Sequence, residues 1–297
     1  MLQMAKKRLL ITGANGMLGN KAVVLASRNY EVTPLHHAKP LHNNSLEVDI
    51  ANKEQVFGIF RKLQPNAVIH AAAETNVDKC ETQKEHAWNV NVEGTRNVAE
   101  ACAEVNTKLI HISTDYVFDG EKGFYNEEDK PNPANYYGFT KLEGEKQVIE
   151  CCKNYVILRT SVLYGCHPWK QNFATWIINK LKQQQEIAVV EDHYNTPTLA
   201  DNLAEMAVEV TEKDLRGLYH TSGRERISRC EFAKQIAKTF NLNADLVKPV
   251  KMSESTAWIA KRPKDSSLNT GKIQKQLITK PLNIAEGLNK MKEEMRT

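Results

Sequence analysis

The chain has 297 residues, of which 41% are hydrophobic and 26% are charged. This length suits one large domain or two modest ones, and this composition excludes wholesale disorder. The formal net charge is only +4, which is too small to indicate a protein dedicated to binding nucleic acid.

Targeting and redox signals are also missing from the sequence. No apolar stretch is long enough to predict a transmembrane helix, and the N-terminal residues lack the pattern of a signal peptide. The six cysteines form no C-x-x-C pair and have no zinc-ligand spacing. We therefore expect a cytoplasmic protein with reduced thiols, no metal, and neither a membrane nor a nucleic acid as partner.

Short apolar runs alternate with helical patterns through the first half of the chain. Strands are expected at 8–12, 31–35, 67–70, 109–113 and 155–159, and helices at 18–27, 53–63, 86–105 and 136–151. Strands that alternate with helices of this length predict a parallel sheet with helices on both faces. The strands are continuous apolar runs, as a sheet covered on both sides requires.

The alternation loosens after residue 164. Helices are expected at 172–182, 201–210, 229–240 and 283–295, and strands at 186–190 and 217–221. We predict an α/β fold with a Rossmann-type doubly wound parallel sheet at 1–165, to which 190–225 returns. Residues 166–189 and 226–297 should form a smaller, interwoven C-terminal substrate lobe. Ligands of such sheets bind at the carboxyl ends of the strands.

A glycine loop lies between the first expected strand and the first expected helix, with the spacing G-x-x-G-x-x-G. Glycines permit a tight turn and let a pyrophosphate approach the backbone, and a helix N-terminus offers free N–H groups. A strand before the loop and a helix after it are the context that a dinucleotide site requires. Cofactor contacts are expected from Gly13, Asn15, Gly16, Met17, Leu18 and Gly19.

The second expected strand runs into Leu35-His36-His37-Ala38-Lys39 and offers no Asp or Glu for an adenosine 2′-hydroxyl. His37 or Lys39 could instead meet a 2′-phosphate, although both could equally be exposed loop residues. We therefore expect NADPH as the cofactor, with NADH possible. Asp49 and Ile50 are placed against the adenine, but Asp49 could equally cap the helix expected at 53.

Tyr137 and Lys141 lie four residues apart at the start of an expected helix, so their side chains leave the same face. An ammonium beside a phenol favours the phenolate and lowers the pKa of the tyrosine toward neutrality. Tyr137 would then be a usable general acid or base for a carbonyl oxygen. A hydroxyl of Ser113-Thr114-Asp115, at the end of an expected strand, could hold the same oxygen. Tyr136 is the competing tyrosine, but it would point elsewhere.

Two runs bear a resemblance that extends over nearly the whole chain. Residues 113–120 are Ser-Thr-Asp-Tyr-Val-Phe-Asp-Gly, and residues 137–145 are Tyr-Gly-Phe-Thr-Lys-Leu-Glu-Gly-Glu. Both resemble signatures of the dTDP-4-dehydrorhamnose reductase family, whose members are extended short-chain reductases that reduce the 4-keto group of a nucleotide-linked 6-deoxysugar. Shorter matches lie at 71–73, 77–79, 90–94, 159–165, 172–173, 192–198 and 262–268.

The resemblance implies a catalytic trio of Thr114, Tyr137 and Lys141. It implies further cofactor contacts from Ala71, Ala72, Ala73, Asn91, Ser113, Tyr137, Lys141 and Thr160. It places the nucleotide sugar beside Thr75, Val77, Asp115, Val162, Asn172 and Arg262. Arg262 suits the diphosphate because a planar guanidinium can bind a phosphate through two hydrogen bonds. Asn91 could equally be a buried amide that ties its helix to its neighbours.

The chain departs from the family pattern at two places, and other functions stay open. Val162 replaces a common Trp, which leaves the sugar unidentified, and Glu74 replaces a Tyr. Reduction of dTDP-4-dehydrorhamnose to dTDP-rhamnose is the favoured reaction. A 4,6-dehydratase would need a Glu at Tyr116. A nucleotide-sugar epimerase, or a non-catalytic regulatory subunit resembling methionine adenosyltransferase β, is the alternative.

The oligomeric state is also open, and both a monomer and a homodimer are compatible with the sequence. The acids at 127–129 are expected to be solvated rather than to bind a metal.

We expect NADPH to be used at least as well as NADH, because no acid after the second strand repels a 2′-phosphate. Steady-state kinetics with each cofactor check this expectation. A strong preference for NADH without binding of NADPH would contradict it, and the loop at 36–39 would then have to exclude the phosphate sterically.

Overall fold

A seven-stranded parallel sheet forms the centre of the larger lobe in this computed structural model, which describes residues 6–254 and 258–296. The strand order is β11-β6-β5-β4-β1-β2-β3. The strands are β1 (Arg8–Thr12), β2 (Glu31–His36), β3 (Leu46–Glu47), β4 (Ala67–His70), β5 (Lys108–Thr114), β6 (Tyr155–Thr160) and β11 (Gly217–His220). The chain builds outward from β1 in one direction and then from β4 in the other, so the strand order reverses between these two strands.

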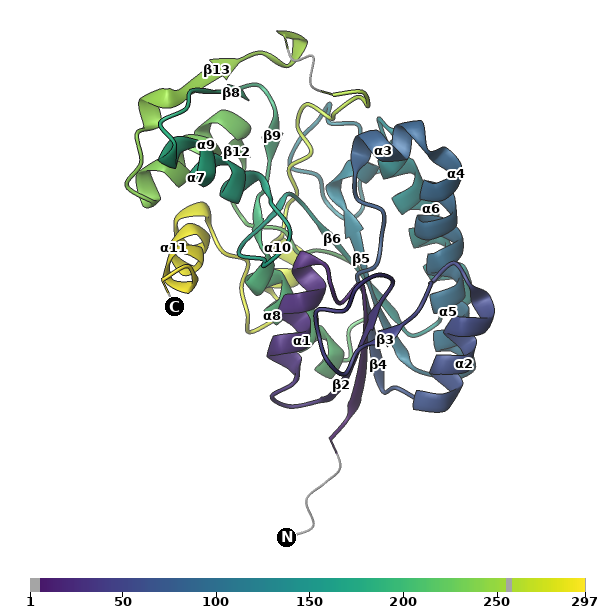
Figure 1. Ribbon diagram of the computed structural model, residues 1–297. Helices are drawn as coiled ribbons and strands as arrows, with labels where there is room; N and C mark the ends of the chain where they lie inside the picture. The colour runs from purple at the N-terminus through teal and green to yellow at the C-terminus, as the bar shows by residue number, and fades with distance from the viewer. Residues whose placement is uncertain (1–5, 255–257, 297) are drawn as a thin grey trace.

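Helices cover both faces of this sheet (Figure 1). On one face lie α1 (Met17–Ala26) and α8 (Ala200–Glu212), and on the other lie α2 (Lys53–Leu63), α5 (Gly94–Glu104) and α6 (Tyr136–Cys151). Alternate residues of β1 serve the two layers: Leu9 and Ile11 pack with α1 and α8, whereas Leu10 packs with the other helices. This arrangement confirms the predicted fold class.

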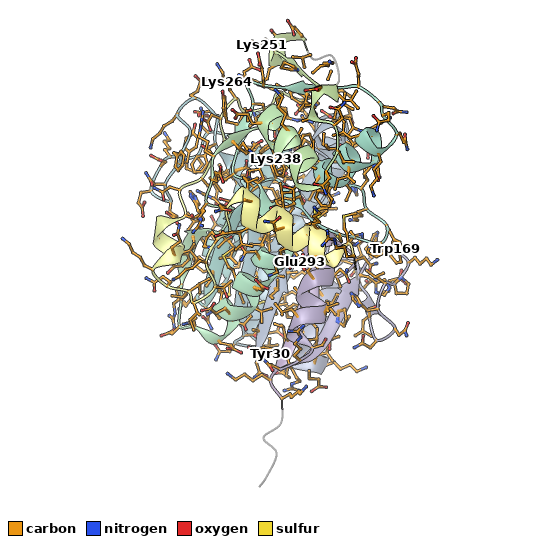
Figure 2. The ribbon with its side chains drawn as sticks, turned by 90° about the vertical axis from the view of Figure 1, so that its left-hand side faces the viewer. Tyr30, Trp169, Lys238, Lys251, Lys264 and Glu293 are labelled. Carbon is orange, nitrogen blue, oxygen red and sulfur yellow. The ribbon has the colours of Figure 1, made fainter. Side chains whose placement is uncertain are left out.

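The smaller lobe has a separate apolar core. Its helices are α7 (Phe173–Lys182), α9 (Arg229–Thr239) and α11 (Ile284–Glu294), which pack beside the parallel pair β8 (Ile187–Val190) and β13 (Val247–Val250). Short pairs join β7 (Leu163–Tyr164) to β10 (Thr198–Leu199) and β9 (Tyr194–Asn195) to β12 (Ile227–Ser228). In Figure 2, Lys251 marks the far end of this lobe and Tyr30 the base of the larger one. Within the described residues, every helix is too short or too polar to cross a membrane.

The helix expected at 86–105 is present, but it is not a regular α-helix throughout. The segment contains α4 (Lys84–Trp88), a π-helical turn (Asn89–Glu93) and α5, and a separate α3 (Val77–Thr82) precedes them. The π-helical turn holds the side chain of Asn91 inward, where it is wholly buried and hydrogen-bonded. Such turns, with i→i+5 hydrogen bonds, are rare and occur mostly as single turns inside α-helices. The apolar periodicity of the segment did not predict this one.

A buried ion pair fixes α6 to the sheet. Arg159 of β6 donates to the carboxylate of Glu145 through Nε at 2.9 Å and through a terminal nitrogen at 2.7 Å. Both side chains are at least 96% buried. Ser113 of β5 donates to the same carboxylate at 2.5 Å. One acid of α6 is therefore bonded to two neighbouring strands.

Glu145→Ala is expected to lower the free energy of unfolding by about 3–5 kcal/mol, because it leaves the Arg159 guanidinium buried without its partner. Urea-induced unfolding measures the change. Glu143→Ala is the matched control on the same helix, because Glu143 pairs with the half-exposed Lys146, a kind of contact worth about 0.5 kcal/mol. An equal decrease in the free energy of unfolding in the two variants would contradict a larger contribution from the buried pair than from the exposed one.

Candidate active site

A cavity of about 1490 Å³ opens at the carboxyl ends of the central strands. Thr12, Thr114 and Thr160, which close β1, β5 and β6, all line it. Trp169, which Figure 2 labels near the edge of the molecule, and Arg229 line it from the side of the smaller lobe. The cavity thus lies where the strand order reverses, the position at which open α/β sheets bind their ligands.

The glycine loop forms one end of the cavity. Gly13 has a φ of +67°, and a Cβ at this position would lie 2.7 Å from the amide nitrogen of Ala72. A Cβ at Gly19 would lie 2.2 Å from the carbonyl oxygen of Gly13. Gly16 caps α1 without a side-chain hydrogen bond, and the first turn holds no acid. The free amides and partial positive charge of this helix N-terminus suit a phosphate group.

The Asn15 side chain ties the glycine loop to the loop that follows β2. Its amide nitrogen donates to the carbonyl oxygen of Lys39 at 2.8 Å, and its oxygen accepts from the amide of Leu41 at 3.0 Å. His37 and Lys39 both line the cavity. The two residues from which we predicted a contact with a 2′-phosphate therefore lie on the wall beside the glycine loop.

Asp49 and Ile50 also line this part of the cavity. The Asp49 carboxylate accepts a hydrogen bond from the amide of Ala51 at 2.9 Å. The cap of α2 is instead Asn52, whose side chain accepts from the amide of Gln55. Asp49 is therefore not the cap of this helix, and its carboxylate lies in a turn at the cavity wall.

Tyr137 and Lys141 reach the cavity from the first turns of α6, which Asn135 caps. A Cβ at Gly138 would lie 2.0 Å from the carbonyl oxygen of Tyr116, so the start of α6 lies directly against the turn after β5. Thr114 is hydrogen-bonded to the Tyr137 phenol. The three predicted catalytic residues thus lie together on one wall.

The protonation states differ from those expected from the sequence. Burial raises the pKa of Tyr137 above its ordinary value, although the hydrogen bond with Thr114 lowers it in part. The Lys141 ammonium turns elsewhere: it donates to the carbonyl oxygen of Ile112 at 2.9 Å and lies 3.4 Å from Nε2 of His111. The prediction that Lys141 lowers the pKa of Tyr137 toward neutrality is therefore wrong. Burial lowers the pKa of Lys141 itself to about 8.

Two histidines behind Lys141 were missed in the sequence. The rings of His70 and His111 lie 5.2 Å apart, and burial lowers the pKa of both, so both are neutral. Nδ1 of His70 lies 2.7 Å from the Thr12 hydroxyl, and its Nε2 lies 3.1 Å from the hydroxyl of Thr95. The available signal was a histidine directly after Ala-Val-Ile in β4 and another between the two isoleucines of β5.

Asp115 lies at the junction of the two lobes. Its carboxylate accepts hydrogen bonds from Ser161 at 2.8 Å, from Ser266 at 2.5 Å and from Thr114 at 3.1 Å. Ser266 in turn accepts from the side-chain amide of Asn195 at 3.0 Å. Burial raises the pKa of Asp115 to about 6 in spite of these hydrogen bonds. The carboxylate thereby joins the end of β5 to segments from much later in the chain.

The remaining cofactor and substrate predictions divide into two groups. Most of these residues line the cavity: Met17, Leu18, Ala71, Ala72, Ala73, Thr75, Val77, Ser113, Asp115, Thr160 and Val162. Val162 has a φ of +42°, in the left-handed region that is a strained conformation for a β-branched residue. Asn91, Asn172 and Arg262 are not among the lining residues.

Each of these three residues is engaged in local contacts. Asn172 caps α7 and donates to the carbonyl oxygen of Gly165 at 2.7 Å. The guanidinium of Arg262 donates to the Asp78 carboxylate at 2.8 Å and to the carbonyl oxygen of Ala260 at 2.9 Å. These contacts occupy the polar atoms that we expected to face the nucleotide sugar.

Asn91 has the contacts of a buried connecting amide. Its side chain exchanges hydrogen bonds with both backbone polar groups of Glu74, at 2.8 and 3.1 Å, and donates to the hydroxyl of Thr140 at 3.0 Å. It thereby links the segment after β4 to α6. The Glu74 carboxylate, which the sequence left unexplained, accepts from the ammonium of Lys79 at 2.6 Å.

The three acids of the loop at 127–129 have separate partners. Glu127 accepts from the amide of His220 at 2.9 Å, and Asp129 pairs with Lys122 at 2.6 Å. Within the described ranges, no group of three His, Cys, Asp or Glu side chains is placed to hold a metal ion.

A doubly wound sheet, a glycine turn leading into a helix N-terminus, and a Thr-Tyr-Lys set at the reversal of strand order define a dinucleotide-binding protein of the short-chain reductase type. The chain belongs to the RmlD substrate binding domain family, whose model matches residues 7–297. This confirms the family predicted from the two sequence runs.

Three similar proteins illustrate the range of the family. The chain is 35% identical to the dTDP-4-dehydrorhamnose reductase of Aggregatibacter actinomycetemcomitans, over 92% of this chain and 94% of that one. It is 34% identical to methionine adenosyltransferase 2 subunit beta of Rattus norvegicus, over 90% and 82%. The crystal structure of a Bacillus anthracis str. Ames dTDP-4-dehydrorhamnose reductase in complex with NADP superimposes with a TM-score of 0.89, at 35% identity, over 97% and 99%.

Lys141→Met is expected to raise the free energy of unfolding at pH 7 by roughly 2–4 kcal/mol, because it removes a buried charge whose pKa is far below its ordinary 10.5. At pH 7 the amine is charged in both states, so the folded state bears the full cost. Between about pH 8 and 10.5 the unfolded wild type holds a proton that the folded protein has released. The free energy of unfolding of the wild type therefore rises relative to that of the variant as the pH increases through this range.

Urea unfolding at pH 7 and pH 9.5 checks this expectation. Lys146→Met, which changes a half-exposed lysine of the same helix, is the matched control and should change stability little at either pH. A Lys141→Met variant less stable than wild type by the same amount at both pH values would contradict the buried-charge interpretation.

Proposed function

We propose that this protein is an NAD(P)H-dependent oxidoreductase that reduces the 4-keto group of a nucleotide-linked 6-deoxysugar. dTDP-4-dehydrorhamnose is the first substrate to test. The observation that supports this most strongly is the placement of Thr114, Tyr137 and Lys141 on one wall of a cavity that ends at the glycine turn. The names of the relatives from Aggregatibacter and Bacillus support the same reaction.

The cofactor proposed is NADPH, with NADH possible. The α1 N-terminus suits its pyrophosphate, and the close approach of Gly13 to Ala72 leaves no room for a side chain there. His37 and Lys39 are the proposed partners of a 2′-phosphate, since both line the adjoining wall. When bound, the cofactor supplies a hydride for the sugar carbon.

The residues of α6 and β5 would handle the charge that develops on the carbonyl oxygen. Tyr137 donates the proton, and its raised pKa keeps the phenol protonated at neutral pH. Thr114 hydrogen-bonds to the same oxygen. Lys141, charged below about pH 8, holds the ribose of the cofactor. To reach the ribose, its ammonium would have to leave the Ile112 carbonyl and turn toward the cavity.

A 4,6-dehydratase is disfavoured by the residue after Asp115. Elimination of water needs a carboxylate base near the sugar, and Tyr116 occupies that position. Burial raises the pKa of the Tyr116 phenol, although the positive charge of the neighbouring Arg229 lowers it in part. Tyr116 is therefore a poor base at neutral pH.

A second candidate function is a non-catalytic subunit, because the rat methionine adenosyltransferase subunit is about as similar as the reductases. The two functions differ in turnover. Oxidation of NADPH, followed by absorbance in the presence of dTDP-4-dehydrorhamnose, supports the reductase. Binding of NADPH without oxidation across a panel of keto sugars would favour the subunit.

Tyr137→Phe is expected to lower kcat by ~10²–10⁴, the usual contribution of a general acid, and to leave NADPH affinity nearly unchanged because the ring stays. Tyr136→Phe is the control. The Tyr136 ring packs against Phe139 and Lys84 outside the cavity. Removing its hydroxyl should therefore change kcat and NADPH affinity little. Stopped-flow or steady-state kinetics on both variants give the comparison.

Full activity in Tyr137→Phe together with inactivity in Tyr136→Phe would mean that the catalytic assignment fails. Lys141→Ala should lower both kcat and cofactor affinity, since this residue is proposed to act on both.

A further inference from the structure

Arg229 is a charged residue of the cavity wall. The proposed reaction gives this side chain no contact with the substrate. It is the first residue of α9, and it lines the cavity with Tyr116 and Tyr137. The Tyr116 and Tyr137 rings meet edge to face, with centroids 5.8 Å apart. The Arg229 guanidinium, which interacts electrostatically with Tyr116, is therefore close to the proposed proton donor.

The Arg229 side chain is held firmly but lacks a counter-ion. Its guanidinium carbon lies 4.7 Å from the centre of the Phe173 ring, and its backbone nitrogen donates to the carbonyl oxygen of His193 at 2.9 Å. Between residues 6–254 and 258–296, no carboxylate oxygen lies within 4.0 Å of its nitrogens. Because the side chain is half-buried, leaving its positive charge without a counter-ion costs free energy.

Other arginines held in the structure have such a partner. Arg159 pairs with Glu145 at 2.7 Å, Arg226 with Asp265 at 2.7 Å, and Arg262 with Asp78 at 2.8 Å; these three pairs are the comparison set. Arg226 is the closest parallel to Arg229, because it also lies over an aromatic ring, that of Tyr194, at 3.8 Å.

Asp115 is the acid near Arg229, but its oxygens are already used. One accepts from Ser161 and Ser266, and the other accepts from Thr114. These bonds hold the carboxylate toward the junction of the lobes. The guanidinium is left with N–H groups at the cavity, and a guanidinium fork fits two oxygens of one phosphate or carboxylate.

We propose that Arg229 binds an anionic pair of oxygens on the substrate, either on the diphosphate of the nucleotide or on a carboxylate of the sugar. This inference rests on the proposed function, which puts the nucleotide sugar in this half of the cavity. It moves the anion contact from Arg262, which Asp78 already occupies, to Arg229. It also makes Arg229 a determinant of specificity, because a substrate without an anion at this point would leave the charge unpaired.

Calorimetric titration of the NADPH-saturated protein tests the inference without turnover. The probes are dTDP, dTDP-glucose and dTDP-glucuronate. Arg229→Gln, which stays polar and loses the charge, should weaken binding of all three by about tenfold to a hundredfold if the diphosphate is the partner. If a sugar carboxylate is the partner, only dTDP-glucuronate should weaken by that factor. Arg226→Gln is the matched control and should leave all three affinities unchanged.

Unchanged affinity for all three probes in Arg229→Gln, with wild-type affinity for NADPH, would overturn the inference. If that variant does not fold, Arg229→Met decides, since it removes the charge and keeps a long side chain. A loss of affinity confined to the probes then supports the proposal, and wild-type affinity overturns it. Wild-type protein that binds dTDP through Arg229 yet reduces no keto sugar would refute the proposed reaction and leave this inference standing.

Discussion

The buried ion pair between Glu145 and Arg159 determines where the reactive groups lie. Tyr137 projects from α6 and Thr114 closes β5, and these elements could slide past one another if only apolar contacts joined them. A shift of α6 would separate two charges in an interior where neither could find another partner. Ser113 bonds to the same carboxylate and extends the constraint to β5. The distance between phenol and hydroxyl is therefore set largely by Glu145 and Arg159, neither of which lines the cavity.

The lobes meet through polar contacts as well as apolar ones. Asp115 bonds to Ser266, and Ser266 to Asn195, so the end of β5 is joined to two segments of the later chain. Hydrogen bonds are directional, whereas apolar surfaces can slide. The wall that holds Tyr137 and the wall that holds Arg229 are thus kept in one arrangement, and the width of the cavity follows from it.

The sequence allowed prediction of those features that depend on short-range spacing. Continuous apolar runs predicted the sheet, and a separation of four residues put Tyr137 and Lys141 on one face. The direction of the Lys141 ammonium could not be predicted, because it depends on a carbonyl group of a different element. Arg262 meets Asp78, which is 184 positions away, and no local pattern announces such a pair. Arg229 faces the cavity only because of how the two lobes pack.

The placement of β11 and α8 has a consequence for synthesis of the chain. Both come late in the sequence, yet β11 covers the edge of β6, and α8 packs on the buried face of α1. When β6 has just left the ribosome, the nascent chain still exposes the unpaired edge of β6 and the apolar face of α1. The larger lobe cannot close until residues 200–220 have emerged. During that interval the unfinished sheet is a target for chaperones and for pairing with other chains.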